Sequence, residues 1–232
     1  EASLFSELIL LTTIIYCLSL VLTRSCGHVV EGHYAHGGAV GTSSENGACA
    51  TLSTVHTYGY GTGTVDKRYA CNLYSDTVRV NGEIVRLENG DPLVYMPLAV
   101  EVNLTNSPYV KTAGARMAKY EVDPNAYNDG KSPDNDIVLF RYADILLMKA
   151  EAEVRNGENG DAEMNAVRSR SGMGYRPATL DNILAERLME LMWEGWRRND
   201  LIRFDRFHRS YDQRTAPATE ADRHTIVFPI PA

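Results

Sequence analysis

The stretch from Asp136 to Phe207 constrains the fold most, because it reads as three helices in short succession. Apolar residues between Ile137 and Val154 surround the first of these helices on nearly all sides. Such a distribution is typical of a helix buried at the centre of a fold rather than one on its surface. Asp134 or Asp136 is expected to cap the start of this helix, and Gly157 is expected to end it in a left-handed turn.

A second helix is predicted from Asp161, after only a few polar residues, so it should pack antiparallel to the first and form a helical hairpin. Gly172 and Gly174 are expected to stop it. The third helix starts with Thr179 as its N-cap and carries an apolar stripe that reaches Gly195. The C-terminal part of the chain is therefore predicted to be mainly helical, with a hairpin followed by a third long helix.

The other face of the third helix is charged, and it carries Glu186, Glu190 and Glu194 at four-residue spacing. A glycosidase requires two carboxylates that face each other across the substrate from separate elements. Three glutamates on one helix face, next to arginines, are more typical of solvated surface charge, and we interpret them in that way. The arginines between Arg197 and Arg214 alternate with aspartates, which favours local ion pairs over nucleic-acid binding.

One carboxylate on the first helix is expected to be partly buried. Glu151 shares a stripe of that helix with Leu147 and Val154, and a buried carboxylate requires a partner. Arg168 on the antiparallel second helix is within plausible reach. The sequence therefore predicts a structural ion pair between Glu151 and Arg168.

The first part of the chain reads as short strands and long loops. Asn81-Gly82 stands between alternating apolar residues and predicts a two-residue hairpin. Residues 123–136 are acidic and rich in turn formers, and they lack the EF-hand order of oxygens, so we interpret them as a solvated linker. The predicted fold class is α+β, with a strand-and-loop segment over residues 1–133 and a helical segment over residues 134–232.

The most apolar run extends from Leu8 to Leu22. We expect a buried strand there, because the run is short for a membrane helix and rich in β-branched residues. A transmembrane helix and a signal peptide are the alternatives. The four cysteines form no CxxC pair, and the histidines around Glu31 follow no zinc spacing, so no metal is expected.

Four phrases follow one another along the second half of the chain: FRYADILLMKAEAEVRNG, NAVRSRSG, ERLMELMWEGWRRNDLIRF and the closing FPIPA. In this order and at these spacings they resemble the SusD/RagB family. The resemblance implies a surface-exposed outer-membrane lipoprotein that captures glycans or other nutrients over a TonB-dependent transporter. Members of the family are considerably longer than these 232 residues, and most of their helical repeats lie in the first half. The chain therefore resembles one SusD-like domain without its N-terminal helical-repeat half.

On this resemblance we expect non-catalytic binding of an oligosaccharide or related nutrient at the cell surface, and its delivery to a SusC-like TonB-dependent outer-membrane transporter. The lipid anchor is expected on an N-terminal part that precedes this sequence. The residues offer no nucleophile with its base and no cofactor fingerprint, and a net charge of −7 argues against nucleic acid. A glycoside hydrolase and a purely structural scaffold of a transport complex are the alternatives.

The candidate ligand site lies in the segment YGYGTG, where Tyr58 and Tyr60 alternate with glycines. Exposed rings on a loop suit sugar recognition, because a flat ring covers the apolar C–H face of a pyranose while its hydroxyl stays in water. The alternative is that both rings pack over the core. Tyr34, His36 and Asn46 are predicted companions that could donate hydrogen bonds to sugar hydroxyls.

Overall fold

The computed structural model describes residues 49–80, 82–100, 105–109, 112–119, 136, 138–210, 212 and 226–227. The chain divides into two compact units, the first comprising Glu1–Leu139 with Trp193–Gly195, and the second comprising Phe140–Met192 with Trp196–Ala232. The predicted strand at Leu8–Leu22, the histidine-rich segment, most of the predicted linker and the closing FPIPA lie outside the described residues. The prediction of one SusD-like domain without its N-terminal half stays a prediction.

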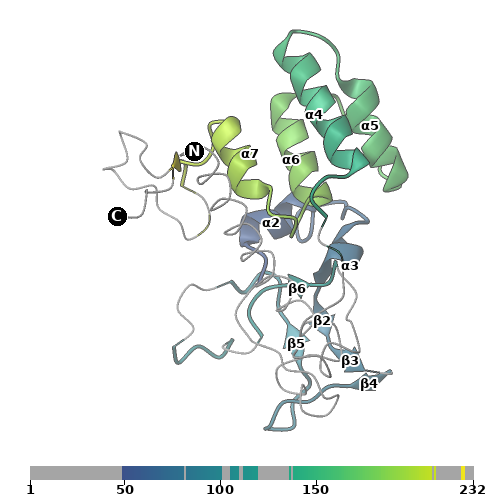
Figure 1. Cartoon of the computed structure of the whole chain (residues 1–232). Coiled ribbons are helices and arrows are strands. Elements are labelled where there is room, and N and C mark those ends of the chain that lie inside the picture. The colour runs from purple at the N-terminus through teal and green to yellow at the C-terminus, as the bar shows by residue number, and fades with distance from the viewer. Residues whose placement is uncertain are drawn as a thin grey trace. The chain divides into compact units, whose positions relative to one another are not determined.

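Short helices and short antiparallel strand pairs make up the described part of the first unit (Figure 1). The helices are α2 (Leu52–Thr57) and α3 (Tyr69–Asn72), and the Thr51 side chain caps α2 by accepting the N–H of Thr54. The strand pairs are β1 (Leu73–Tyr74) with β6 (Arg116–Met117), β2 (Asp76–Thr77) with β5 (Val94–Tyr95), and β3 (Arg79–Val80) with β4 (Glu83–Ile84).

The predicted hairpin is the pair β3 and β4. Arg79 lies opposite Ile84, and Val80 lies opposite Glu83. Gly82 has a φ of +87°, a left-handed conformation that a tight hairpin turn requires and that glycine adopts without steric cost. The hairpin is therefore confirmed, and a small core of buried residues lies beside it: Val78, Val85, Leu93 and Tyr95.

The second unit is helical, which confirms the predicted α+β class with a helical C-terminal part. Its helices are α4 (Tyr142–Arg155), α5 (Asp161–Arg170), α6 (Leu180–Glu190) and α7 (Arg197–Arg203). α4 packs against both α5 and α6, and α5 follows it after a short turn, as the predicted helical hairpin requires (Figure 1).

The helix ends of this unit follow the local signals. Gly157 and Gly172 have φ values of +79° and +68°, so the chain turns away after α4 and α5. The Thr179 hydroxyl accepts the N–H of Asn182 at 3.2 Å and caps α6. These three expectations are confirmed.

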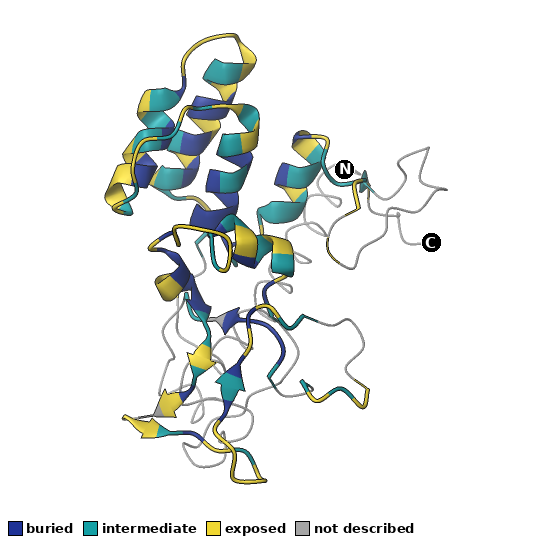
Figure 2. Ribbon diagram, turned by 180° about the vertical axis from the view of Figure 1, so that it is seen from behind, coloured by how far each residue is buried: buried dark blue, intermediate teal, exposed yellow. Residues whose placement is uncertain are grey.

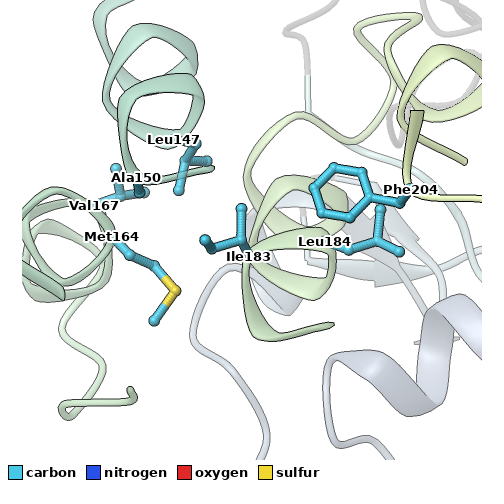
Figure 3. Packing of buried hydrophobic residues seen from close by; sticks show 7 residues of the cluster. All are labelled: Leu147, Ala150, Met164, Val167, Ile183, Leu184 and Phe204. Carbon is cyan, nitrogen blue, oxygen red and sulfur yellow. The ribbon is translucent and has the colours of Figure 1, made fainter. Parts of the chain in front are cut away.

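The core of the second unit joins its four helices. Figure 3 shows Ile183 of α6 opposite Leu147 and Met164, while Phe204, which caps the end of α7, covers Leu184. All members of this core are at most 9% exposed: Leu147, Ala150, Met164, Val167, Ile183, Leu184 and Phe204. Removal of this apolar surface from water holds the helices together.

The prediction that the first helix is buried on nearly all sides was wrong. α4 begins at Tyr142, and its N-cap is Arg141 rather than an aspartate. Phe140, Tyr142 and Ile145 are 72%, 76% and 47% exposed, and α4 presents exposed residues along its length (Figure 2). The buried face of α4 carries charged side chains beside apolar ones, so the apolar residues alone did not indicate which face is buried. The buried residues of this helix are Asp144, Leu147, Ala150 and Glu151.

The third helix is shorter than predicted. α6 ends at Glu190, because Trp193 and Gly195 both take left-handed backbone conformations, with φ values of +65° and +83°. The chain therefore turns before α7 starts at Arg197. Among the described residues, none of the helices combines the length and the apolarity needed to cross a membrane.

Candidate functional site

Tyr58, one of the two predicted ligand-binding rings, is a core residue. It caps the end of α2 and is 1% exposed. Its hydroxyl accepts a hydrogen bond from Nδ2 of Asn72 at 2.8 Å, and its ring meets Tyr69 at 75° with centroids 5.8 Å apart. The expectation of an exposed ring at Tyr58 was wrong, because α3 packs Asn72 and Tyr69 against it.

Tyr60 has a different environment two residues later. It is half-buried, and its ring stacks on Tyr69 with centroids 5.0 Å apart and an interplanar angle of 20°. Tyr69 itself is only 6% exposed, so one face of the Tyr60 ring is covered by a buried ring. A stacked aromatic pair of this kind fixes the orientation of the outer ring.

The hydroxyl of Tyr60 interacts with Asp76 at the start of β2. The pKa of Tyr60 is raised above its ordinary value, mainly because the hydroxyl is partly buried. The negative charge of Asp76 and the hydrogen bond to it raise this pKa further. Burial is also the main cause that raises the pKa of Tyr69 to about 12. Asp76 is exposed and has a left-handed backbone with φ of +64°, which aspartate tolerates better than most residues. Asp76 lies sixteen positions after Tyr60 in the sequence, so no local sequence pattern predicted their contact.

The loop that carries Tyr60 is held by close backbone contacts. At Gly59 a Cβ atom would lie 2.2 Å from the carbonyl oxygen of Thr64, so only glycine fits there. A Cβ atom at Gly61 would lie 3.4 Å from Cδ1 of Leu98, whose side chain is 49% exposed. We call Tyr60, Tyr69, Asp76 and Leu98 the Tyr60 patch.

A buried ion pair fixes the far end of the same loop. The N–H of Asp66 donates to the carbonyl oxygen of Tyr58 at 2.7 Å. The Asp66 carboxylate accepts from Nε of Arg68 at 2.9 Å and from Nη2 at 2.8 Å. The Tyr60 patch therefore offers a supported flat ring on a fixed loop, with an exposed carboxylate from β2 and the exposed Leu98 side chain near the same loop. This combination suits a ligand with both C–H faces and hydroxyls.

The other predicted site residues, Tyr34, His36 and Asn46, lie outside the described residues. Their participation stays a prediction. Of the two predicted residues that the structure describes, both Tyr58 and Tyr60 contact Tyr69, but Tyr58 is buried, whereas Tyr60 is half-buried and interacts with Asp76. The sequence suggested neither Tyr69 nor Asp76 as a partner.

The three glutamates that the sequence assigned to one face of the third helix were predicted to be solvated, and this was wrong. Glu186, Glu190 and Glu194 are 0%, 3% and 5% exposed. Their carboxylates accept from Arg168, from Arg141 and Arg170, and from Lys119, respectively. Basic side chains from other elements cover them, so four-residue spacing next to arginines did not indicate a solvent-facing stripe.

Glu151 has other partners than predicted. Its Oε1 accepts from Nε of Arg155 at 2.9 Å, and its carboxylate accepts from Nε and Nη2 of Arg203 at 2.9 Å each. Arg168 instead binds Glu186, so the predicted Glu151–Arg168 pair was wrong. Burial alone would raise the pKa of Glu151, but the hydrogen bonds from Arg203 and Arg155 outweigh it and hold the pKa below its ordinary value.

Arg187 lies at the centre of a buried group of charges that Arg203 links to Glu151 by also donating to Asp200. It donates to Oδ1 of Asp144 at 2.8 Å and to Oδ1 of Asp200 at 2.9 Å, and the three side chains are each 1% exposed. Burial raises the pKa of Asp200, while Arg187 and Arg203 oppose that shift. Such enclosed pairs hold α4, α6 and α7 in register and offer no surface to a substrate. Across the described residues, no group of histidine, cysteine or carboxylate side chains could hold a metal ion.

Comparison with known proteins gave consistent matches. A model of the SusD family matches residues 53–226. The chain is 35% identical over 104 residues to "Starch-binding protein SusD" of Bacteroides thetaiotaomicron, a match that covers 41% of this chain and 18% of that protein. It is 38% identical over 86 residues to "SusD-like protein P38" of Formosa agariphila, which covers 30% of this chain and 17% of the relative.

A solved structure is also similar in part. It is a SusD superfamily protein from Bacteroides vulgatus, with 21% sequence identity and a TM-score of 0.44, and the match covers 68% of this chain and 34% of that one. The aligned stretches span less than a fifth of the length of the two curated relatives.

Proposed function

The chain belongs to the SusD family, and from this we propose that it binds a glycan without cleaving it and delivers it to a SusC-like TonB-dependent outer-membrane transporter. We place the protein at the outer surface of the cell, on a lipid anchor. The family match over residues 53–226 is the observation that carries this proposal. A curated relative that is named as starch-binding supports a glycan as the ligand class.

The Tyr60 patch is our candidate for one glycan contact. Tyr69 supports the Tyr60 ring from one side, which leaves its other side for the C–H face of a pyranose. Asp76 is exposed beside the Tyr60 hydroxyl and accepts hydrogen bonds from sugar hydroxyls, and the exposed Leu98 extends the apolar edge. Tyr34, His36 and Asn46 are proposed as further hydrogen-bonding groups of the same ligand.

The glutamates of α6 that could be taken for a glycosidase pair are not placed for hydrolysis. A glycosidase uses one carboxylic acid and one carboxylate that flank the substrate. Glu186, Glu190 and Asp144 are instead buried and held by arginines. A carboxylate that is enclosed and ion-paired neither reaches a glycosidic bond nor donates a proton to it.

The test is calorimetry of the full chain against soluble starch, xylan, β-glucan and galactomannan. Tyr60→Ala should weaken binding to the best of these by about three- to tenfold, the loss expected for one aromatic contact. Tyr142→Ala is the matched control, because it removes another tyrosine that is 76% exposed and lies in the second unit. Equal affinities of Tyr60→Ala and Tyr142→Ala would place the contact elsewhere.

Two further outcomes separate the alternatives. Release of shorter saccharides during incubation, followed by chromatography, would overturn non-catalytic binding and favour a hydrolase. Binding to none of the four polysaccharides, with retained capture of the transporter, would favour a scaffold.

A further inference from the structure

The loop between α5 and α6, Ser171–Thr179, has no regular secondary structure but is bound to α5 along its length. Asp161 Oδ1 accepts the N–H of Ala178 at 2.5 Å. Asn165 accepts the N–H of Arg176 at 2.9 Å and donates to its carbonyl oxygen at 2.8 Å. The loop backbone is therefore satisfied by side chains of the helix before it, which fixes its conformation.

Two carbonyl groups of the loop accept further hydrogen bonds. Arg168 Nε donates to the carbonyl oxygen of Gly174 at 2.9 Å, and Asn182 Nδ2 of α6 donates to that of Pro177 at 2.9 Å. Asp161, Asn165 and Arg168 stand four and three residues apart, so they lie on one face of α5. Three polar residues on one face of this helix thus hold the loop.

This loop displays Tyr175, whose side chain is 70% exposed. Its hydroxyl donates to Oδ2 of Asp161 at 2.7 Å, so the tip of the ring is held although its faces are open. The hydrogen bond to Asp161 raises the pKa of Tyr175. The pKa of Asp161 is lowered, mainly by the hydrogen bond from the N–H of Ala178 and next by that from the Tyr175 hydroxyl. The ring is therefore oriented before any ligand arrives, which reduces the entropy lost on binding.

The neighbours of Tyr175 leave room for a flat ligand. Gly172, Gly174 and Pro177 are exposed, and apart from its two chain neighbours no residue has an atom within 4 Å of the position that a Cβ atom would take at Gly174. A stable protein–protein interface covers about 800 Å² on each partner. One ring among glycines and a proline is too small for such an interface but matches the face of a single sugar ring.

We infer that Tyr175 is a second sugar-stacking ring of this chain, separate from the Tyr60 patch and oriented by Asp161. The inference rests on the proposed function, because it takes the same ligand class, a glycan with pyranose units. The two rings belong to different units of the chain, so each contributes its own contact.

The experiment uses the full chain and the polysaccharide that the parent binds best among soluble starch, xylan, β-glucan and galactomannan. Tyr175→Ala should weaken binding about three- to tenfold in calorimetry. Tyr175→Phe keeps the ring but loses the hydrogen bond to Asp161, so its affinity should lie between those of the parent and of Tyr175→Ala. Tyr142→Ala, the exposed control, should match the parent. Circular dichroism checks that each variant is folded.

An affinity of Tyr175→Ala equal to that of Tyr142→Ala overturns the inference. If Tyr175→Ala does not fold, Tyr175→Leu decides in its place, since it keeps apolar bulk without a flat ring. A loss in Tyr60→Ala with none at Tyr175 refutes only this inference. A parent that binds none of the polysaccharides refutes the proposed function and this inference with it.

Discussion

Arg168 of α5 donates a hydrogen bond from Nη1 to Oε2 of Glu186 on α6 at 2.7 Å, and the two side chains are 5% and 0% exposed. The same guanidinium also holds Gly174 in the following loop. A buried pair of this kind loses much hydration on folding, so its net contribution is small while both partners are present. Removal of one partner, however, leaves a buried charge without that compensation.

We predict that Arg168→Met lowers the free energy of unfolding by about 3–5 kcal/mol, because Glu186 then keeps a buried charge without its arginine. Arg206→Met is the matched control. Arg206 pairs with Asp181, which is 76% exposed, and loss of such a pair should cost about 0.5 kcal/mol or less. Urea denaturation measures both, and equal losses would contradict the buried role of Arg168.

The second prediction concerns pH and Glu151. Its pKa is held below the ordinary value of 4.5, so its contribution to stability is complete above that pH and is lost as pH falls through the lowered pKa. Glu151→Gln should therefore be less stable than the parent at pH 7, and the difference should shrink as the pH falls from 5 to 3. Urea denaturation at each pH measures it. A difference that stays constant down to pH 3 would show that the arginines do not favour the ionised form.

The third prediction concerns the approach of α5 to α4. A Cβ atom at Gly160 would lie 2.6 Å from the carbonyl oxygen of Ala150 and 2.9 Å from its Cα, so the helix backbone itself would have to move. Gly160→Ala should cost about 1–3 kcal/mol. Gly174→Ala, with open space around it, should change stability by about 0.5 kcal/mol or less. Thermal unfolding of both variants tests the contact, and a harmless Gly160→Ala would contradict it.

The fourth prediction tests which face of α4 is buried. Leu147 is 0% exposed and Ile145 is 47% exposed. Leu147→Ala should cost about 2–5 kcal/mol through lost burial and a cavity, whereas Ile145→Ala should cost about 1 kcal/mol or less. Chemical denaturation of the two variants distinguishes this orientation from the all-round burial that the apolar pattern suggested. A larger loss at Ile145 would reverse the assignment.

The parts of the fold that the sequence predicted correctly depend on neighbouring residues. Thr179 caps α6, Gly157 and Gly172 end α4 and α5, and Gly82 turns the hairpin. Each of these signals acts through a hydrogen bond or a backbone angle within a few residues, so a local pattern contains the information. The family resemblance rests on the same helices, and the family match over residues 53–226 confirms it.

At the candidate site, local sequence patterns did not predict which residues are buried. Tyr58 and Tyr60 look alike in the sequence, yet Tyr58 is buried against Asn72 and Tyr69, while Tyr60 lies on Tyr69 beside Asp76. Their difference comes from α3 and β2, which follow later in the chain. Tyr175 likewise donates its hydroxyl hydrogen bond to Asp161, fourteen positions before it in the sequence.

By itself, the sequence determined the family, the helical hairpin, the ends of its helices and the turn of the hairpin at Gly82. Only the tertiary structure decided which carboxylate pairs with which arginine. Glu151 pairs with Arg203 and not with Arg168, and Arg168 pairs with Glu186. The physical reason is that each residue turns a helix by about 100°, so a pairing between helices depends on their rotation and spacing. The rotation and spacing of the helices depend on how the whole core packs, including Leu147, Ile183 and Phe204. These residues come from distant parts of the chain, so no short stretch of sequence predicts their packing.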